Sequence, residues 1–155
     1  MKAMNLDLLR EKAAYVRISA LEDAVRAQKG HLGGTFSCVE LLVALYYTGF
    51  LGVEKIRNQD STRDFFFIGK GHACLALYPI FKDLKFISQE RYLEYGLNGS
   101  SLGGQLDTSI TGAENNTGSL GHALPVSVGI ALGLKLKKSD SQVYCLMSDG
   151  ELDEG

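Results

Sequence analysis

Glycine-rich turns constrain this chain more strongly than any other feature of its sequence. Glycine accounts for 18 of the 155 residues, against only 2 prolines, whereas ordinary chains contain about 7% glycine. Each of the 3 histidines follows a glycine in such a turn, at Gly30-His31, Gly71-His72 and Gly121-His122. Because glycine allows the backbone to come close to another group, the pattern predicts several tight backbone approaches and is a first indication of a binding function.

The segments between these turns alternate between helical and strand-like patterns. Apolar residues recur every three to four positions from Leu6, which predicts an amphipathic helix over residues 6–28 with Gly30 as its C-cap. Ser37-Cys38-Val39-Glu40 has the spacing of a capping box and opens a second, buried helix that runs to Tyr47. The other expected elements are strands over 64–68 and 142–147, a helix after residue 72, and helices over 88–95 and 120–138.

This order of elements predicts an α/β fold with a mostly parallel sheet flanked by helices. Residues 96–119 are rich in glycine, serine, threonine and asparagine and contain few apolar residues. Such a stretch resembles a linker in composition, but a long ordered loop inside a compact domain is more often functional.

Length, charge and cysteine content exclude several classes of protein. With 155 residues the chain is expected to form one domain or a piece of something larger. Sixteen basic and eighteen acidic residues give a net charge of -2, which argues against nucleic acid or an anionic membrane as a partner. Cys38, Cys74 and Cys145 lie far apart and suggest neither a disulfide framework nor a zinc site. Charges near the start argue against a signal peptide, so we expect a soluble, cytoplasmic protein.

Two glycine turns follow predicted strands, which is where parallel sheets bind ligands. Gly69-Lys70-Gly71-His72 follows the first strand and leads into a helix whose N-terminal N–H groups would face an anion. Asp149-Gly150 follows the last strand and offers a carboxylate oxygen of the kind that Mg²⁺ prefers. The first turn lacks the spacing of a P-loop, and the glycines after residue 29 follow a helix, unlike a dinucleotide-binding fingerprint.

Each of these candidates also has an ordinary structural explanation. A histidine in a glycine turn is often only a hydrogen-bonding group, and Asp-Gly is a common turn dipeptide. Glu151, Asp153 and Glu154 fit a solvated acidic tail equally well, and residues 96–119 fit plain surface. The combination of motifs is more specific than any one of them.

Taken in order, five motifs resemble the amino-terminal, pyrophosphate-binding half of transketolase, above all the transketolases that are split into two chains. The motifs are Lys29-Gly30-His31-Leu32-Gly33-Gly34, Gly69-Lys70-Gly71-His72-Ala73, Asn98-Gly99-Ser100-Ser101-Leu102-Gly103-Gly104, Thr117-Gly118-Ser119-Leu120-Gly121-His122 and Ser148-Asp149-Gly150-Glu151-Leu152-Asp153-Glu154-Gly155. The resemblance covers nearly all of the chain. It implies a thiamine-diphosphate-binding fold in which residues 1–155 form part of a pyrophosphate-binding domain, incomplete at the C-terminus.

The resemblance also implies the ligand and the residues that hold it. Thiamine diphosphate would bind through Mg²⁺, or through Ca²⁺ or Mn²⁺ in its place, between two domains. Asp149 matches the metal carboxylate, and Gly150 matches a backbone N–H that meets the diphosphate. His72 matches a histidine that contacts the diphosphate and His31 one that lines the substrate channel, so both are expected to be catalytic. Further cofactor-binding positions are Gly118 and Ser119 beside the aminopyrimidine, Leu120 on the thiazolium, and Glu154 at the subunit interface.

The chain departs from the family pattern at three places. Gln105 stands where the family has a substrate-binding histidine, and it can form hydrogen bonds but cannot carry a charge. Ser148 stands where the family usually has glycine. The family's second metal ligand, an asparagine, lies farther along the chain than Gly155, and the glutamate that activates the cofactor belongs to another domain.

The expected function is transfer of a two-carbon ketol unit between sugar phosphates, with no activity for this chain alone. A carboxy-terminal transketolase half, which carries the pyrimidine-binding domain, would be the second chain of a homo- or hetero-oligomer. Two alternatives stay open: a non-catalytic remnant or interaction module, and a fragment of an enzyme similar to deoxyxylulose-phosphate synthase.

Overall fold

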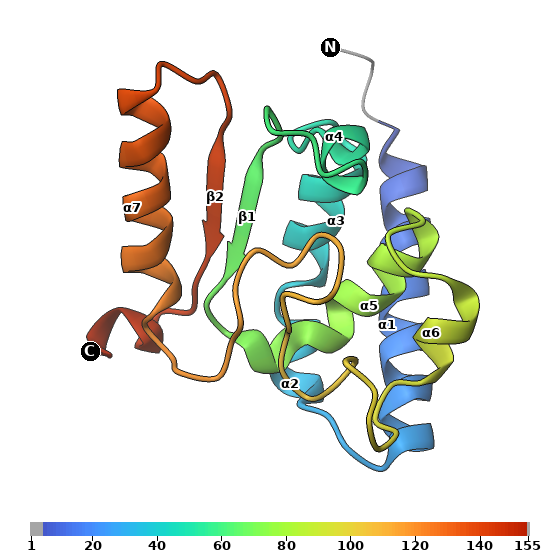
Figure 1. The fold of residues 1–155 in the computed structure, drawn as a ribbon. Helices are drawn as coiled ribbons and strands as arrows, with labels where there is room; N and C mark the ends of the chain where they lie inside the picture. Colours follow the sequence, from blue (N-terminus) through green and yellow to red (C-terminus); the bar gives the residue numbers. More distant parts are fainter. Residues whose placement is uncertain (1–4, 155) are drawn as a thin grey trace.

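The computed structural model describes residues 5–154 and contains a short parallel sheet (Figure 1). Strand β1 (Phe65–Ile68) pairs in parallel with β2 (Val143–Leu146), with Phe65 opposite Val143 and Ile68 opposite Leu146. Parallel strands require a long crossover connection, and the chain between them supplies four helical segments and the loop over residues 96–119. The predicted α/β class and the parallel pairing are confirmed.

Helices lie on both sides of the two strands (Figure 1). On the side of β1 lie α1 (Leu6–Ala27), α3 (Val39–Tyr47) and α5 (Cys74–Asp83), together with the short helices α2 (Leu32–Phe36), α4 (Val53–Arg57) and α6 (Gln89–Leu93). Helix α7 (Ala123–Leu136) lies along β2 on the other side. Two 3₁₀ turns, η1 (Gly71–Ala73) and η2 (Gly150–Asp153), follow the two strands.

The hydrophobic core surrounds α5. Residues Cys74 to Phe81 of this helix are all buried, as expected of a helix that is apolar on every side. Helices α1 and α3 cover α5, and Tyr46, Phe81 and Phe86 form a cluster of tilted and edge-to-face ring contacts. This packing holds the N-terminal end of α5, and with it the turn after β1, in a fixed position.

Several element boundaries differ from the sequence-based expectation. Helix α1 ends because Gln28 adopts a left-handed conformation with φ of 52°, so Gly30 is not its C-cap. The capping box at Ser37 is wrong, because Cys38 precedes α3 and the Ser37 hydroxyl instead contacts Lys70. Helix α7 begins three residues later than expected, since residues 120–122 complete a turn. The expectation missed α2 and α4, which have five residues each.

The loop over residues 96–119 is ordered and packs on the core. Leu102, Leu106 and Ile110 are buried, and the Tyr78 hydroxyl donates a hydrogen bond to the carbonyl oxygen of Gly103 at 2.9 Å. Arg63 and Glu114 form a two-point ion pair between the start of β1 and the end of the loop. The ordered-loop interpretation is therefore confirmed over the linker interpretation.

Within residues 5–154, none of the helices combines the length and the apolar character needed to cross a membrane.

Candidate functional site

The two predicted binding turns lie side by side at the carboxyl ends of the strands. The N–H of Gly69, which follows β1, donates to the carbonyl oxygen of Leu146 at the end of β2, at 2.9 Å. Three other segments lie against these two turns, with Gly34 beside His72, Gln105 beside Gly71, and Gly121 beside Glu154.

His31 and His72 face each other across the first and second glycine motifs. Their ring centroids are 5.4 Å apart and the rings are nearly perpendicular, at 67°. Gly34 leaves room for this arrangement, because a Cβ there would lie 2.9 Å from Nε2 of His72. The structure thus brings together the two histidines that the resemblance assigns to catalysis.

The environment of His72 favours the neutral imidazole. Burial lowers the pKa of His72 most, and the nearby His31 and Lys70 act in the same direction, whereas Glu151 opposes them. A neutral imidazole both accepts and donates a hydrogen bond. At neutral pH His72 can therefore offer one nitrogen as donor and the other as acceptor.

Lys70 is a site residue that sequence reasoning missed. Its side chain is only 8% exposed, and its ammonium donates to the Gly34 carbonyl oxygen at 3.1 Å and to Ser37 Oγ at 2.6 Å. These bonds connect the turn after β1 to α2. The sequence places Lys70 inside a glycine motif beside an expected anion-binding turn, and that position is the signal that could have identified it.

Gln105 lies against the turn after β1, together with Thr117. The Thr117 hydroxyl is 3.0 Å from Oε1 of Gln105, and it also accepts a hydrogen bond from the N–H of Leu106 at 2.8 Å. A Cβ on Gly71 would lie 2.0 Å from Thr117 Oγ1 and 2.5 Å from Gln105 Oε1. The expected substrate-binding residue Gln105 thus lies beside Gly71, the residue before His72, and Thr117 is a second residue of this site with no predicted role.

The turn after β2 meets the turn that precedes α7 through Glu151. The carboxylate of Glu151 accepts hydrogen bonds from the N–H of Gly121 at 3.1 Å and of Ser148 at 3.2 Å. Glu151 is 1% exposed, so it is not part of a solvated acidic tail, whereas Asp153 is exposed. The burial of one acidic residue in an Asp- and Glu-rich segment has no signature in the sequence.

The remaining predicted cofactor residues lie on these two turns. Asp149 is exposed at the start of η2, and Gly150 follows it with open space where a Cβ would be. Gly118 has a φ of +137°, and, as at Gly150, no other atom lies within 4 Å of the position that a Cβ would take. Ser119 is exposed, Leu120 is half-buried, and the Cβ of Glu154 lies 2.9 Å from the position of a Cβ on Gly121.

These residues fit a diphosphate with one divalent cation better than they fit an all-protein metal site. Within the part of the chain that the structure describes, no three His, Cys, Asp or Glu side chains are grouped to hold a metal ion. Mg²⁺ usually takes one or two protein carboxylates and completes its shell with phosphate oxygens and water. Asp149 can supply such a carboxylate, and Lys70 and His72 lie at the same edge of the sheet.

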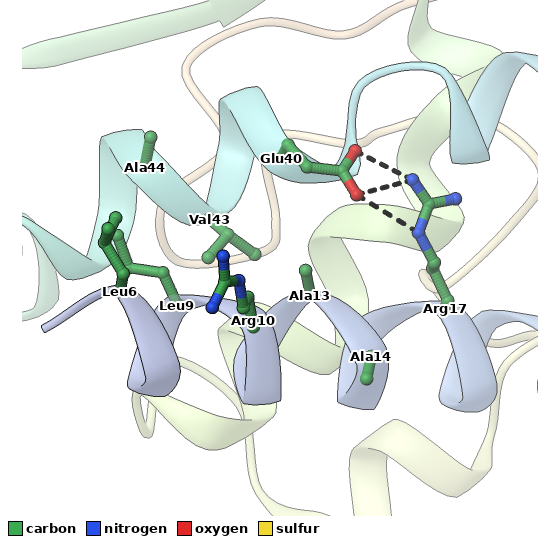
Figure 2. A pocket seen from close by; sticks show the side chains of 9 residues that line it. All are labelled: Leu6, Leu9, Arg10, Ala13, Ala14, Arg17, Glu40, Val43 and Ala44. Atoms are coloured by element: carbon green, nitrogen blue, oxygen red, sulfur yellow. Dashed lines mark hydrogen bonds and ion pairs between the residues drawn. The ribbon is translucent and has the colours of Figure 1, made fainter.

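A groove in the described part of the chain lies away from these turns. It has a volume of about 420 Å³ and lies between α1 and α3, lined by Leu6, Leu9, Arg10, Ala13, Ala14, Arg17, Glu40, Val43 and Ala44 (Figure 2). Arg17 closes one end of it by an ion pair with Glu40, at 2.6 Å and 2.7 Å from Nη2 to the two carboxylate oxygens. The lining contains none of the predicted site residues.

Comparison with known proteins identifies the family. Residues 9–155 match the family described as transketolase, thiamine diphosphate binding domain. The chain is 39% identical over 152 residues to a subunit of the apulose-4-phosphate transketolase of Phocaeicola vulgatus, covering 98% of this chain and 54% of that protein. It is 30% identical over 154 residues to human transketolase, covering 97% of this chain and 24% of that protein.

Solved structures agree with this assignment. Transketolase from Campylobacter jejuni superposes with a TM-score of 0.83 at 27% identity, over 98% of this chain and 25% of that one. The chain thus spans about half the length of the Phocaeicola vulgatus subunit and about a quarter of the length of human transketolase. By sequence and by fold, this chain belongs to the transketolase family and corresponds to its thiamine diphosphate binding domain.

Proposed function

We propose that this chain is the N-terminal part of a transketolase that transfers a two-carbon ketol unit between sugar phosphates. The observation that carries the proposal is the convergence of the glycine turns on the carboxyl ends of β1 and β2, with His31, His72, Gln105 and Asp149 on those turns. Two relatives are named as subunits of an apulose-4-phosphate transketolase. Their names support a sugar phosphate as the substrate class.

The proposed division of labour follows from the residue types. Asp149 would hold Mg²⁺, or Ca²⁺ or Mn²⁺ in its place, and the N–H of Gly150 would contact the diphosphate. Gly118, Ser119 and Leu120 would line the ring system of the cofactor, and Glu154 would lie at the subunit interface. When bound, thiamine diphosphate supplies the nucleophilic carbon that takes up the ketol unit.

The histidines would act on protons and on substrate oxygens. His72, held neutral by its surroundings, can donate a hydrogen bond to a phosphate oxygen or accept a proton. His31 lies against His72 from the N-cap position of α2 and would contact the substrate oxygen nearest the reacting carbon. Gln105 would bind substrate through its amide, as a hydrogen-bonding group without charge.

We also propose that a second chain completes the enzyme. The names of these two relatives describe one subunit of a larger enzyme, which supports a partner for this chain. The partner would be the transketolase half with the pyrimidine-binding domain. In this proposal residues 1–155 are part of a pyrophosphate-binding domain of a cytoplasmic oligomer. The metal ligand and the activating glutamate that the family places outside this segment would come from the rest of the assembly.

Mixing experiments test the proposal directly. The chain is assayed for ketol transfer alone and together with the rest of a two-chain transketolase, namely the second subunit and the part of the first subunit that this chain does not span, in the presence of thiamine diphosphate and Mg²⁺. We expect turnover only in the mixture, and we expect Asp149→Asn to abolish it while Asp153→Asn, which removes the same charge from an exposed neighbour, preserves it. Full turnover by the isolated chain, or none in any mixture, would contradict the proposal.

Two further measurements separate the alternatives. Calorimetry with thiamine diphosphate and Mg²⁺ distinguishes a binding domain from a non-catalytic remnant, since micromolar affinity of the chain argues against a remnant. Product analysis with pyruvate as donor distinguishes ketol transfer from a reaction similar to that of deoxyxylulose-phosphate synthase.

A further inference from the structure

Glu151 is a buried carboxylate whose partners are backbone amides. It lies in η2, and only 1% of its surface is exposed. Oε1 accepts from Gly121 and Oε2 accepts from Ser148, so each oxygen has one N–H donor. Burying a carboxylate is costly unless such charge-assisted hydrogen bonds compensate for the lost water. Apolar packing alone therefore does not explain why a carboxylate is buried at this position.

The two amides belong to different turns of the candidate site. Gly121 closes the turn that carries Gly118 and leads into α7, and Ser148 directly precedes Asp149. A third turn reaches the same carboxylate, because a Cβ on Gly69 would lie only 1.9 Å from Oε1 of Glu151. The Glu151 side chain thus occupies the space between the turns that follow β1, precede α7 and follow β2.

We propose that Glu151 is a positioning residue that sets the distance between these three turns, and hence between the residues that hold the cofactor. Its effect on ligand binding rests on the proposed function, whereas its effect on the turns does not. Removing the carboxylate leaves the buried N–H of Gly121 and the part-buried N–H of Ser148 without this acceptor, which is the unfavourable case for a hydrogen bond. Substituting a residue that orients a metal ligand typically lowers metal affinity by about 10- to 100-fold.

The first test measures the turns in the protein without ligand. Hydrogen exchange is followed at the amides of Gly121 and Ser148 in the wild type, in Glu151→Gln and in Asp153→Asn. In Glu151→Gln one amide faces an NH₂ group instead of an oxygen, so we expect at least one of the two amides to exchange about tenfold faster or more. Asp153→Asn removes the same charge from an exposed position and should leave both rates unchanged. Equal rates in all three proteins would overturn the proposal.

The second test uses the close approach of Gly69. The atoms nearest to a Cβ built on Gly69 all belong to the Glu151 carboxyl group. Gly69→Ala should therefore lower Tm by roughly 5 °C or more in the wild type, and by clearly less in the Glu151→Ala background. Additive effects of the two substitutions on Tm would show that the alanine side chain at position 69 does not clash with Glu151, which would contradict the proposal.

The third test connects the turns to the ligand. Calorimetry with thiamine diphosphate and Mg²⁺ should give a dissociation constant about tenfold higher for Glu151→Gln than for the wild type. The constant for Asp153→Asn should stay within about twofold of the wild-type value. Unchanged affinity in Glu151→Gln would overturn the positioning role, whereas failure of the wild type to bind would count against the proposed function and leave the exchange and Tm results to decide on Glu151.

Discussion

Single glycines decide how closely the turns of the site can approach one another. Gly71 is buried, and a side chain there would enter the space of Thr117, with a Cβ 2.1 Å from the Thr117 Cβ. Gly33 lies one motif away, in α2, with no atom within 4 Å of its Cβ position. The two glycines look alike in the sequence, but only the first is required by packing.

We therefore expect Gly71→Ala to lower the free energy of unfolding by about 1–3 kcal/mol through overpacking. Gly33→Ala is the matched control and should be neutral or stabilising by up to about 1 kcal/mol, because alanine favours a helix. Urea denaturation of both variants measures the difference. Equal changes in the free energy of unfolding would mean that Thr117 moves away from the new side chain without destabilising the protein.

His72 provides a prediction about pH. Because burial, with the nearby His31 and Lys70, lowers the pKa of His72, most of its imidazole is neutral at pH 7. An anion bound at the site favours the charged imidazolium, so the pKa should rise on binding. NMR titration of the His72 ring, assigned by comparison with His72→Gln, should show a pKa below the ordinary histidine value and an upward shift on addition of pyrophosphate. A shift at His122 instead would place the anion elsewhere.

At the scale of elements, a loop rich in glycine and serine is held by an ion pair, hydrogen bonds and a few buried apolar residues. Nε of Arg63 is 2.9 Å and Nη2 is 3.0 Å from the two carboxylate oxygens of Glu114, whose side chain is only 12% exposed. The Arg63 guanidinium also lies 4.5 Å from the centre of the Phe65 ring. This geometry joins the end of the loop to the start of β1.

Glu114→Gln should therefore lower the free energy of unfolding by about 1.5–3 kcal/mol and open the loop over residues 96–119 to proteolysis. Glu54→Gln makes the same substitution in an exposed ion pair with Arg57 and should cost less than about 1 kcal/mol. Chemical denaturation and limited proteolysis provide the two readouts. If the loop resists proteases equally in both variants, its buried apolar residues hold it in place without the Arg63–Glu114 ion pair.

At the scale of the whole molecule, the described part of the chain has an uneven surface. The outer side of α7 exposes Val128, Leu132 and Leu136, the last with 86% of its surface accessible, and Figure 1 shows this helix at one edge of the protein. Exposed apolar surface of this extent is unusual for a monomeric domain. It is consistent with the finding that the chain spans about half the length of its relatives.

Replacing Leu132 and Leu136 together by lysine should reduce the binding of an apolar fluorescent dye to the chain severalfold without lowering its Tm. Leu93→Lys, on α6, changes one isolated exposed leucine and should have little effect on dye binding. Fluorescence titration and thermal denaturation measure both properties. A large loss of Tm in the double variant would instead indicate that α7 contributes this face to the core.

Local patterns in the sequence determined the class of the fold and the segments that form the site. The periodicity after Leu6, the aromatic strand that starts at Phe65 and the order of the glycine motifs depend on near neighbours in the chain, so they can be read without the fold. The Ser88 cap of α6 was predicted for the same reason, and its hydroxyl oxygen accepts the N–H of Arg91.

Only the tertiary structure decided which polar groups act together. The short helices α2 and α4, the contact of Ser37 with Lys70, and the burial of Glu151 all depend on residues far away in the sequence. A side chain with several possible partners takes the one that packing brings within reach, and an acidic residue is buried only where donors from other segments meet it. For that reason the sequence identified the turns of the site, whereas the fold determined how Lys70, Thr117 and Glu151 hold them together.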